Sequence, residues 1–411
     1  MEQKKKMPQV RFKGYDDTWE QRKLENISDV KDGTHDSPKY VQNGHPFITS
    51  KNVGDGFINY DDIQYVSDKD YDEINRRSKV DIHDILMGMI GTIGNLALIR
   101  EKPDFAIKNV ALIKYTGDID YKFLYQILQS HCVTSQLLNS IDGGTQKFIA
   151  LNKIRGLDIP YPGEEEQRKI GLFFEQLDNL ITLHQRKYDK LIKMKRAMLE
   201  KMFPKNGSLY PEIRFEGFTD AWEQRKLGEV GKARSGIGFP EAEQGGTLGM
   251  PFLKVSDMNI AGNENEMIIA NNYVTEAQIE SFHWSPIEEV PAIFFAKVGA
   301  AVMLNRKRLC RSPFLLDNNT MAYSLNDKVW NADFAKVLFE TIDLTSLVQI
   351  GALPSYNTED IEKIMICLPI LAEQRKIGVF FRELDNLITF HQRKLEKLKN
   401  IKKACLEKMF V

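Results

Sequence analysis

The sequence predicts a mixed α/β protein in which two globular bodies are joined by two long helices that form an antiparallel coiled coil. Three observations predict this fold class. Residues 166–203 return almost unchanged as residues 373–410, with 27 of the 38 aligned positions identical. Shorter motifs that precede each copy recur in the same order. Both copies carry one apolar stripe at heptad spacing. We therefore expect an internal repeat with pseudo-two-fold symmetry.

The repeat divides the 411-residue chain into four regions. We expect a first body over residues 1–163, a central long helix over 164–203, a second body over 204–370 and a C-terminal long helix over 371–411. The bodies correspond through pairs of motifs, among them "PQVRFKGYDDTWEQRKL" (8–24) and "PEIRFEGFTDAWEQRKL" (211–227). Because the helical segments are far more alike than the bodies, we expect the helices to share one role and the bodies to differ in theirs.

Short apolar segments predict strands in both bodies. The expected strands cover residues 46–50, 84–91, 96–100 and 110–115 in the first body, and 250–255, 292–299, 301–306 and 320–325 in the second. Between them, "GTIGN" (91–95) and "VGAAV" (298–302) predict tight turns. Exposed backbone amides in such turns suit phosphate binding, but the same pattern suits a plain hairpin, so both interpretations stay open.

The two long segments predict helices of roughly 57 Å each. An apolar stripe of this length needs a partner of equal length, and the other copy is the matching one. His184 and His391 both lie in the stripe, and neither has a companion ligand one turn away. One polar position in a coiled-coil seam commonly sets the register, so we interpret this histidine pair as register residues rather than metal ligands.

Connectivity and charge predict the antiparallel orientation. The second body begins at Pro211, close to the end of the first helix at Phe203, and it then starts the second helix near that same end. The C-terminal halves of the helices, 185–203 and 392–410, each carry five excess positive charges. Antiparallel pairing keeps these halves apart and suits the helix dipoles. We therefore expect the chain to end beside its first body, with adjacent termini.

Composition excludes several classes of protein. The net charge is −1, and because the two helical segments together carry +9, the remainder holds ten excess negative charges. Overall charge therefore gives no sign of a nucleic-acid partner. No apolar run is long enough to span a membrane, and the start of the chain has no apolar signal segment. The four cysteines are scattered without metal-ligand spacing, which favours free thiols in the cytoplasm.

No catalytic motif is present. The chain lacks a GxxxxGK[ST] phosphate loop, an HExxH zinc motif and a GxSxG nucleophile motif. "PDFAIK" (103–108) could supply an acid–lysine pair of a nuclease through Asp104 and Lys108, but this spacing is common by chance. We therefore expect no catalytic residue, metal or cofactor in this chain, with an unrecognised nuclease as one alternative.

The motifs resemble those of the specificity subunit of type I restriction–modification systems. The resemblance rests on the duplicated body-plus-helix plan, on "DGTHDSP" (32–38), "PFITSKN" (46–52) and "GTIGNLAL" (91–98), and on "GTQKFIALNKIRGLDIPYP" (144–162) running into "EEQRKI". It implies that each body is a target-recognition domain that reads one half of a bipartite double-stranded DNA site. It also implies that the helices set the half-site spacing and dock two methyltransferase (modification) subunits.

By the same resemblance, the methyltransferase subunits bind S-adenosylmethionine and methylate adenine N6, motor–nuclease (restriction) subunits join them, and this chain does no chemistry. The other alternative is a coiled-coil scaffold that holds two protein partners without DNA.

Loop residues with cationic, amide or hydroxyl side chains are the candidates for DNA contacts, because such groups reach phosphates and base edges. They are Thr34, His35, Lys51, Asn52, Thr92 and Lys147 in the first body, and Lys254, Asn305, Arg306, Arg308, Ser355 and Tyr356 in the second. Helix flanks and the repeated tryptophans are the candidates for partner binding, although such a tryptophan suits either an interface or a local core. They are Trp19, Trp222, Arg186, Lys187, Arg393 and Lys394.

Overall fold

The computed structural model describes residues 7–145, 147–205, 207–348 and 354–411. The chain divides into two compact units. Unit 1 comprises residues 1–183 with 394–411, and unit 2 comprises residues 184–393. Each unit therefore contains one body and a part of both long helices, so the boundary between the units crosses the helices. The first three residues of the "GALPSY" motif (351–356) lie outside the described residues.

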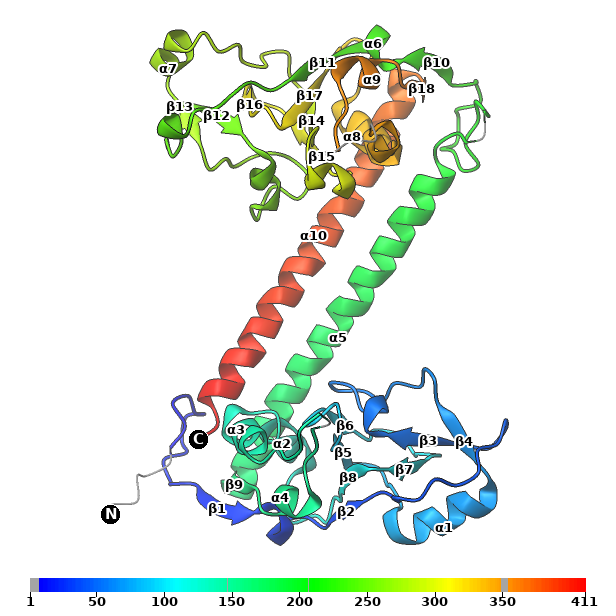
Figure 1. The fold of residues 1–411 in the computed structure, drawn as a ribbon, viewed down its shortest axis with the longest axis vertical. Coiled ribbons are helices and arrows are strands. Elements are labelled where there is room, and N and C mark those ends of the chain that lie inside the picture. The colour runs from blue at the N-terminus through cyan, green and yellow to red at the C-terminus, as the bar shows by residue number, and fades with distance from the viewer. Residues whose placement is uncertain (1–6, 146, 206, 349–353) are drawn as a thin grey trace. The chain divides into compact units, whose positions relative to one another are not determined.

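Unit 1 is a mixed α/β body, as predicted (Figure 1). Its strands are β1 (Glu20–Lys23), β2 (Val30–Asp32), β3 (His45–Thr49), β4 (Gln64–Val66), β5 (Ile85–Gly88), β6 (Leu96–Leu98), β7 (Ala106–Lys108), β8 (Val110–Ile113) and β9 (Asp158–Tyr161). Its helices are α1 (Asp68–Ser78), α2 (Tyr121–Ile127), α3 (His131–Asn139), α4 (Leu151–Arg155) and the first part of α5 (Glu164–Lys201).

The described strands of unit 1 form three sheets. The order β2-β8-β5-β6 is antiparallel throughout, and the order β4-β3-β7 has an antiparallel and a parallel pair. Strand β1 pairs with β9 just before α5 begins. All four residues of β5 and of β8 are buried, which explains why these segments read as continuous apolar runs.

Unit 2 has strands that correspond to those of unit 1. Its strands are β10 (Glu223–Lys226), β11 (Gly231–Ser235), β12 (Met250–Leu253), β13 (Tyr273–Val274), β14 (Ala292–Ala296), β15 (Lys307–Cys310), β16 (Leu315–Leu316), β17 (Thr320–Leu325) and β18 (Met365–Leu368). Its helices are α6 (Leu227–Val230), α7 (Glu276–Ser281), α8 (Ala332–Thr341), α9 (Thr358–Glu362) and, together with the rest of α5, most of α10 (Leu371–Lys408).

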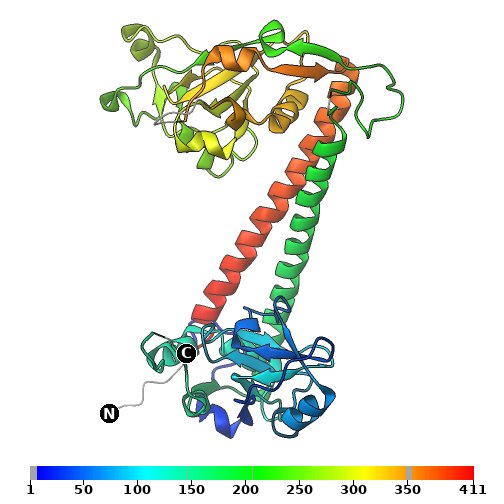
Figure 2. The ribbon, with the colours of Figure 1, turned by 45° about the vertical axis from the view of Figure 1, so that its right-hand side comes forward.

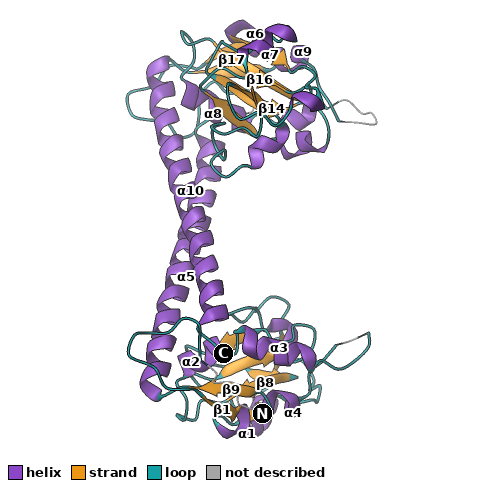
Figure 3. Cartoon of the chain, turned by 90° about the vertical axis from the view of Figure 1, so that its left-hand side faces the viewer, coloured by secondary structure: helices purple, strands orange, loops and turns teal. Residues whose placement is uncertain are grey.

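The sheets of unit 2 have the same topology as those of unit 1. The strand orders are β11-β17-β14-β15, β13-β12-β16 and β10-β18, with the same parallel pair in the second sheet. Helix α8 packs against β14 and β15 (Figure 3). The strand predicted over residues 301–306 is wrong, because this segment forms a 3-10 helix, Ala300–Leu304. It starts after Gly299 at φ 85° and ends at Asn305 at φ 50°, and both left-handed residues turn the chain away from the sheet.

The two long helices pack antiparallel to each other within each unit. In unit 1, the rings of Phe174 and Phe410 stack with centroids 5.7 Å apart, and Asp178 pairs with Lys402 at 2.8 Å. From one contact to the next, the residue number increases on α5 and decreases on α10, so the two helices run antiparallel. In unit 2, His184 contacts His391, and Phe203 approaches Phe381 with ring centroids 6.2 Å apart.

The repeated "EKMF" ends of the long helices belong to the cores of the units. Phe410 packs with Trp19 and Phe174 in unit 1, and Phe203 packs with Trp222 and Phe334 in unit 2. The end of α10 lies beside the body of unit 1 (Figure 2), where the backbone N–H of Val10 donates to the carbonyl of Lys408 at 3.0 Å. The predicted return of the chain to its first body is thereby confirmed for the described residues.

Candidate nucleic-acid interface

The start of α5 is held by a buried ion pair. Glu166, which is 1% exposed, accepts from Nε of Arg11 at 2.6 Å and from Nη2 of the same guanidinium at 2.8 Å. Trp19 donates its indole Nε1–H to the second oxygen of Glu166 at 3.1 Å. The neighbouring Gln167 accepts from the N–H of Asp120 and donates to the carbonyl of Pro162. We call these contacts the helix clamp of unit 1.

The start of α10 has the same helix clamp. Arg214 donates to both oxygens of Glu373, at 2.7 and 2.8 Å, and Gln374 accepts from the N–H of Asn331. One contact differs. Trp222 is 1% exposed, and its indole nitrogen has no hydrogen-bond partner among the described residues. The two tryptophans are thus core residues packed at the starts of the helices, which agrees with the local-core interpretation and corrects their assignment to partner binding.

A glycine on each long helix permits close contact with the body. A Cβ at Gly171 would lie 2.7 Å from Oδ1 of Asp120, and one at Gly378 would lie 2.6 Å from Oδ1 of Asn331. These two body residues cap helices α2 and α8. The buried glutamate, glutamine and glycine of each copy explain why "EQRKIG" is repeated. Sequence reasoning found the repeat but missed these roles, because the partners lie far away along the chain.

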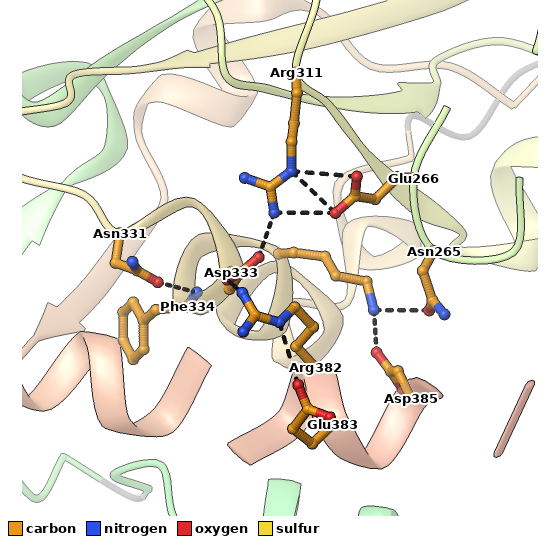
Figure 4. Close-up of polar contacts among 10 residues, drawn as sticks. Asn265, Glu266, Arg311, Asn331, Asp333, Phe334, Arg382, Glu383 and Asp385 are labelled. Atoms are coloured by element: carbon orange, nitrogen blue, oxygen red, sulfur yellow. Dashed lines mark hydrogen bonds and ion pairs between the residues drawn. The ribbon is translucent and has the colours of Figure 1, made fainter. Parts of the chain in front are cut away.

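The next contact between body and helix has opposite charges in the two units. In unit 1, Lys122 of α2 pairs with Glu175 of α5 at 2.7 Å. In unit 2, the equivalent residues are Asp333 of α8 and Arg382 of α10, paired at 2.7 Å. Asp333 also accepts from Arg311, whose guanidinium in turn contacts Glu266 at 3.0 Å (Figure 4).

Equivalent residues pair across the helices in both units. Asp178 pairs with Lys402 in unit 1, and Lys195 pairs with Asp385 at 2.6 Å in unit 2. Asp385 is the repeat equivalent of Asp178, and Lys402 is the repeat equivalent of Lys195, each 207 residues later in the chain. Such doubly formed pairs are the pattern of an isologous two-fold interface. His184 meets its own equivalent, His391, with the Nδ1 atoms 2.8 Å apart. Burial, followed by the nearby His184 and Lys187 charges, lowers the pKa of His391.

The loops predicted from "DGTH", "SKN" and "GTIGN" meet in unit 1. Ser50 Oγ donates to the carbonyl of Asn109 and accepts from the N–H of Met89 at 3.0 Å. Thr92 donates its hydroxyl to the carbonyl of Ser50. His35 contacts Oδ1 of Asn109 at 2.8 Å. We call residues 32–37, 50–52, 89–95 and 107–109 the loop cluster of unit 1.

The candidate residues of the first body lie in or beside this loop cluster. His35 and Lys51 are exposed, Thr34 and Thr92 are half-buried, and Lys147 is exposed next to Phe148, which forms a bridge with Ile90. Asn52 is a correction, because it is 2% exposed. Its side chain accepts from the N–H of Thr49 and donates to the carbonyl of Asn59, so it fixes the loop and is not open to DNA.

The candidate residues of the second body are more buried than those of the first, and several of them form hydrogen bonds within the unit. Tyr356 is 5% exposed and donates its hydroxyl to the carbonyl of Ala296, so it belongs to the core, which corrects its assignment. The amide oxygen of Asn305 accepts from the N–H of Leu344 at 3.1 Å, so Asn305 is a structural turn residue, a further correction. Ser355 is half-buried in a bridge with Val298, the equivalent of the Phe148–Ile90 bridge.

The cationic candidates of unit 2 are half-buried. Lys254 donates to Oε1 of Gln244 at 2.9 Å. Arg306 donates to Asn259, and Arg308 donates to the carbonyl of Asn263. Burial lowers the pKa of Arg308. Between them, Lys307 is 3% exposed, and burial lowers its pKa to about 8. Sequence reasoning passed over Lys307, because its burial follows from its place on β15 beside α8.

The flanks of the long helices are exposed. Arg186, Lys187, Arg393 and Lys394 all lie at the surface, and Arg393 pairs with Glu264 at 3.0 Å. Apolar side chains also lie exposed at matching positions of the two helices. These pairs are Leu172 with Val379, Leu180 with Leu387, and Leu183 with Phe390, each side chain between 46% and 50% exposed.

Asp104 and Lys108, the residues of the alternative nuclease site, have separate partners. Asp104 contacts Nδ1 of His45 at 2.7 Å, and Lys108 donates to Oγ of Ser37. Among the described helices, none is long and apolar enough to cross a membrane.

Comparison with known proteins agrees with the repeated plan of the chain. The family described as type I restriction modification DNA specificity domain matches residues 16–193 and again residues 219–400. The MjaIX specificity subunit of a type I restriction enzyme from Methanocaldococcus jannaschii is 23% identical over 410 residues, covering 95% of this chain and 92% of that protein. The MjaVIII specificity subunit from the same organism is 23% identical and covers 90% of this chain and 88% of its own length.

A solved structure has the same fold. The crystal structure of a type I restriction–modification S subunit from M. genitalium covers 99% of both chains with a TM-score of 0.70 at 16% sequence identity. At this identity the likeness concerns the fold alone. Because the family matches twice and spans most of the sequence, the chain belongs to the type I restriction modification DNA specificity family.

Proposed function

We propose that this chain is the DNA specificity subunit of a type I restriction–modification complex, and that each body reads one half of a bipartite double-stranded site. One observation carries the proposal: the two units share their topology and their helix clamps but differ in their loops. A protein that holds two recognition surfaces in the same way and varies only those surfaces suits a DNA site with two different halves.

The long helices set the distance between the half-sites in this proposal. They act as an antiparallel coiled-coil spacer, and half-sites read from one face of DNA lie about one helical turn, roughly 34 Å, apart. The proposed domain boundaries stay at residues 163, 203 and 370. The body of unit 1 and the body of unit 2 are the two target-recognition domains.

The same helices dock two methyltransferase subunits in this proposal. The exposed apolar pairs at matching positions give each partner an equivalent hydrophobic patch, with cations such as Arg186 and Arg393 on the flanks. Two copies of one partner require two equivalent surfaces, which a repeated sequence supplies. The partners bring S-adenosylmethionine and methylate adenine N6, and restriction subunits join them. This chain does no chemistry, and the complex acts in the cytoplasm.

Selection from random DNA tests the proposal. The chain assembled with its methyltransferase subunits is incubated with duplexes of random sequence, and the bound fraction is sequenced. We expect two conserved blocks separated by an unread gap of fixed length. A single block, or no enrichment by an assembled complex, would contradict the proposal and favour a scaffold that binds only proteins.

The docking surface is tested by stoichiometry. Leu180→Asp places a charge in one apolar patch, and Leu180→Asp with Leu387→Asp places charges in both. We expect one methyltransferase subunit per chain for the single variant and none for the double variant, measured by light scattering of the purified complexes. Two bound subunits in the double variant would show that these patches are not the docking surface.

A further inference from the structure

Arg77 in unit 1 is an exposed guanidinium oriented by a buried carboxylate. It is the penultimate residue of α1, and its side chain is 66% exposed. Its Nη2 donates to Oδ1 of Asp32, whose side chain at the end of β2 is only 9% exposed. A guanidinium carries five N–H donors in a planar fork, so a contact through one nitrogen leaves donors available to a ligand.

The same carboxylate orients His35. Oδ2 of Asp32 contacts Nε2 of His35 at 2.8 Å, while the other ring nitrogen contacts Asn109, so the ring is held at both nitrogens although its side chain is 63% exposed. Asn109 has a φ of 52°, in the left-handed region, and its carbonyl accepts from Ser50. Gly33 lies so close to the carbonyl of Ile107 that a side chain would overlap it. Asp32 therefore contacts Arg77 of α1 and His35, and His35 is in turn tied to the loop at Asn109.

This arrangement adds little to the stability of the fold. Exposed ion pairs contribute roughly 0–1 kcal/mol, and burying a carboxylate costs free energy that its partners must offset. Here both partners of Asp32 lie mainly at the surface, so the carboxylate orients them toward solvent instead of joining elements of the core. Non-glycine residues at positive φ, such as Asn109, also concentrate at binding sites.

Unit 2 has no carboxylate at the position equivalent to Asp32. Ser235, at the end of β11, takes the position of Asp32, and Gly236 takes that of Gly33. Beside them lies a cavity of about 320 Å³ whose lining includes Phe282 and Trp284, stacked with ring centroids 4.7 Å apart. Arg234 also lines this cavity, but its guanidinium donates to the backbone carbonyls of Pro286 and Ser285 and to no carboxylate at this place. The two units therefore differ in the side chains around this position.

We propose that Arg77, positioned by Asp32, is a specificity-determining residue of unit 1 and donates to the O6 and N7 atoms of a guanine in its half-site. The inference rests on the proposed function and names one base contact within it. A fixed planar fork matches the two acceptors on the major-groove edge of guanine, the commonest specific contact of arginine. A phosphate contact needs only charge, which the adjacent exposed Arg76 supplies equally well.

Binding to a panel of duplexes tests this assignment. The chain, assembled with its methyltransferase subunits, is compared with Arg77→Ala, Arg77→Lys, Asp32→Asn and the matched control Arg76→Ala. The duplexes carry the selected bipartite site and every single base-pair substitution in both halves, and affinities are measured by fluorescence anisotropy at several salt concentrations. Thermal unfolding of each variant verifies that it is folded, and Arg77→Lys keeps the charge while removing the fork.

We expect both Arg77 variants to bind the complete site about 10- to 100-fold more weakly and to lose discrimination at one base pair of one half-site. Asp32→Asn should weaken the same discrimination to a smaller extent. Arg76→Ala should leave discrimination intact at every base pair, and any loss of affinity should be the same for all duplexes. Discrimination in the other half-site stays intact in every variant and serves as the internal control.

Two results would overturn this inference without affecting the proposed function. In the first, the Arg77→Lys variant discriminates between base pairs as well as the unmodified chain does. In the second, Arg77→Ala weakens binding to all duplexes equally and makes its salt dependence shallower, as the loss of a phosphate contact would. A wild-type complex that selects no bipartite site would instead defeat the proposed function.

Discussion

At the start of α5, Arg11 and Trp19 both donate to Glu166, and at the start of α10, Arg214 donates to Glu373 while the indole of Trp222 donates to nothing among the described residues. The two helix clamps are otherwise alike, down to the glycine one turn later. The loops of the two bodies, in contrast, share their topology but few side chains. The molecule thus keeps the residues that hold the helices and changes the residues that face outward.

The pattern of identity follows from packing. A buried carboxylate and a glycine at close approach tolerate few substitutions, because each leaves an unpaired charge or a steric overlap. Exposed loop side chains such as Lys51 and Lys147 have no such constraint, so they can diverge between the bodies while the framework stays intact.

Removing the buried carboxylate of either helix clamp should have the largest effect. Glu166→Ala leaves the guanidinium of Arg11, whose side chain is 11% exposed, without its partner, and Glu373→Ala does the same to Arg214. We expect each to lower the free energy of unfolding by about 3–5 kcal/mol. Urea unfolding measures this loss, with exposed Glu165→Ala as the control. A loss no greater than that of the control would contradict the clamp.

Lys307 makes unit 2 sensitive to pH. Its pKa falls to about 8 through burial, so between pH 8 and 10.5 the unfolded chain holds this proton more tightly than the folded one, and stability rises with pH. Relative to Lys307→Met, the unmodified chain should gain on the order of 3 kcal/mol across this window. Unfolding at several pH values measures the difference, with exposed Lys232→Met as control. Parallel pH profiles for the unmodified chain and Lys307→Met would refute it.

The two tryptophans should respond differently to the same substitution. Trp19→Phe removes a hydrogen bond to Glu166, whereas Trp222→Phe removes an indole nitrogen that has no partner among the described residues. We expect Trp19→Phe to cost about 1 kcal/mol more than Trp222→Phe, measured by urea unfolding. Equal costs, or a larger cost at Trp222, would mean that the two clamps do not differ in this contact.

The ion pair between body and helix whose charges are reversed between the units, Lys122–Glu175 in unit 1, should give the smallest effect. Lys122→Asp sets a carboxylate against Glu175 and should cost about 1 kcal/mol or less, because both side chains are partly exposed. Adding Glu175→Arg copies the polarity of Asp333 and Arg382 and should restore the loss. A double-mutant cycle measures the coupling. If the second substitution restores nothing, the contact does not contribute to stability.

The sequence was sufficient to predict the mixed α/β class and the two long helices. Periodicity over residues 166–203 and their copy predicts long helices, and short connections with charge predict their antiparallel packing, because both signals are local. The roles of Glu166 and Gly171 could not be predicted in the same way. Their partners, Arg11 and Asp120, lie far away in sequence and meet them only in the folded unit.

The site residues were predicted less well, for a related reason. Loop motifs indicate the right region, since the "DGTH", "SKN" and "GTIGN" segments meet in the loop cluster. Composition alone does not separate a side chain that faces solvent from one that fixes its loop, as with Lys51 and Asn52. Tyr356 was assigned to DNA because of its hydroxyl, yet it takes the core position that Ile149 holds in unit 1. The apolar residues of segment 301–306 alone predict a strand, but the segment forms a 3-10 helix between two residues at positive φ.

The most direct test of the central claim is a genome-wide map of N6-methyladenine in cells that carry the cognate methyltransferase, with and without this chain. The account predicts a split motif that is methylated only when the chain is present, and whose first or second block alone changes when one body is exchanged for that of a relative. Absence of chain-dependent methylation, with a methyltransferase shown to be active on another specificity subunit, would contradict it.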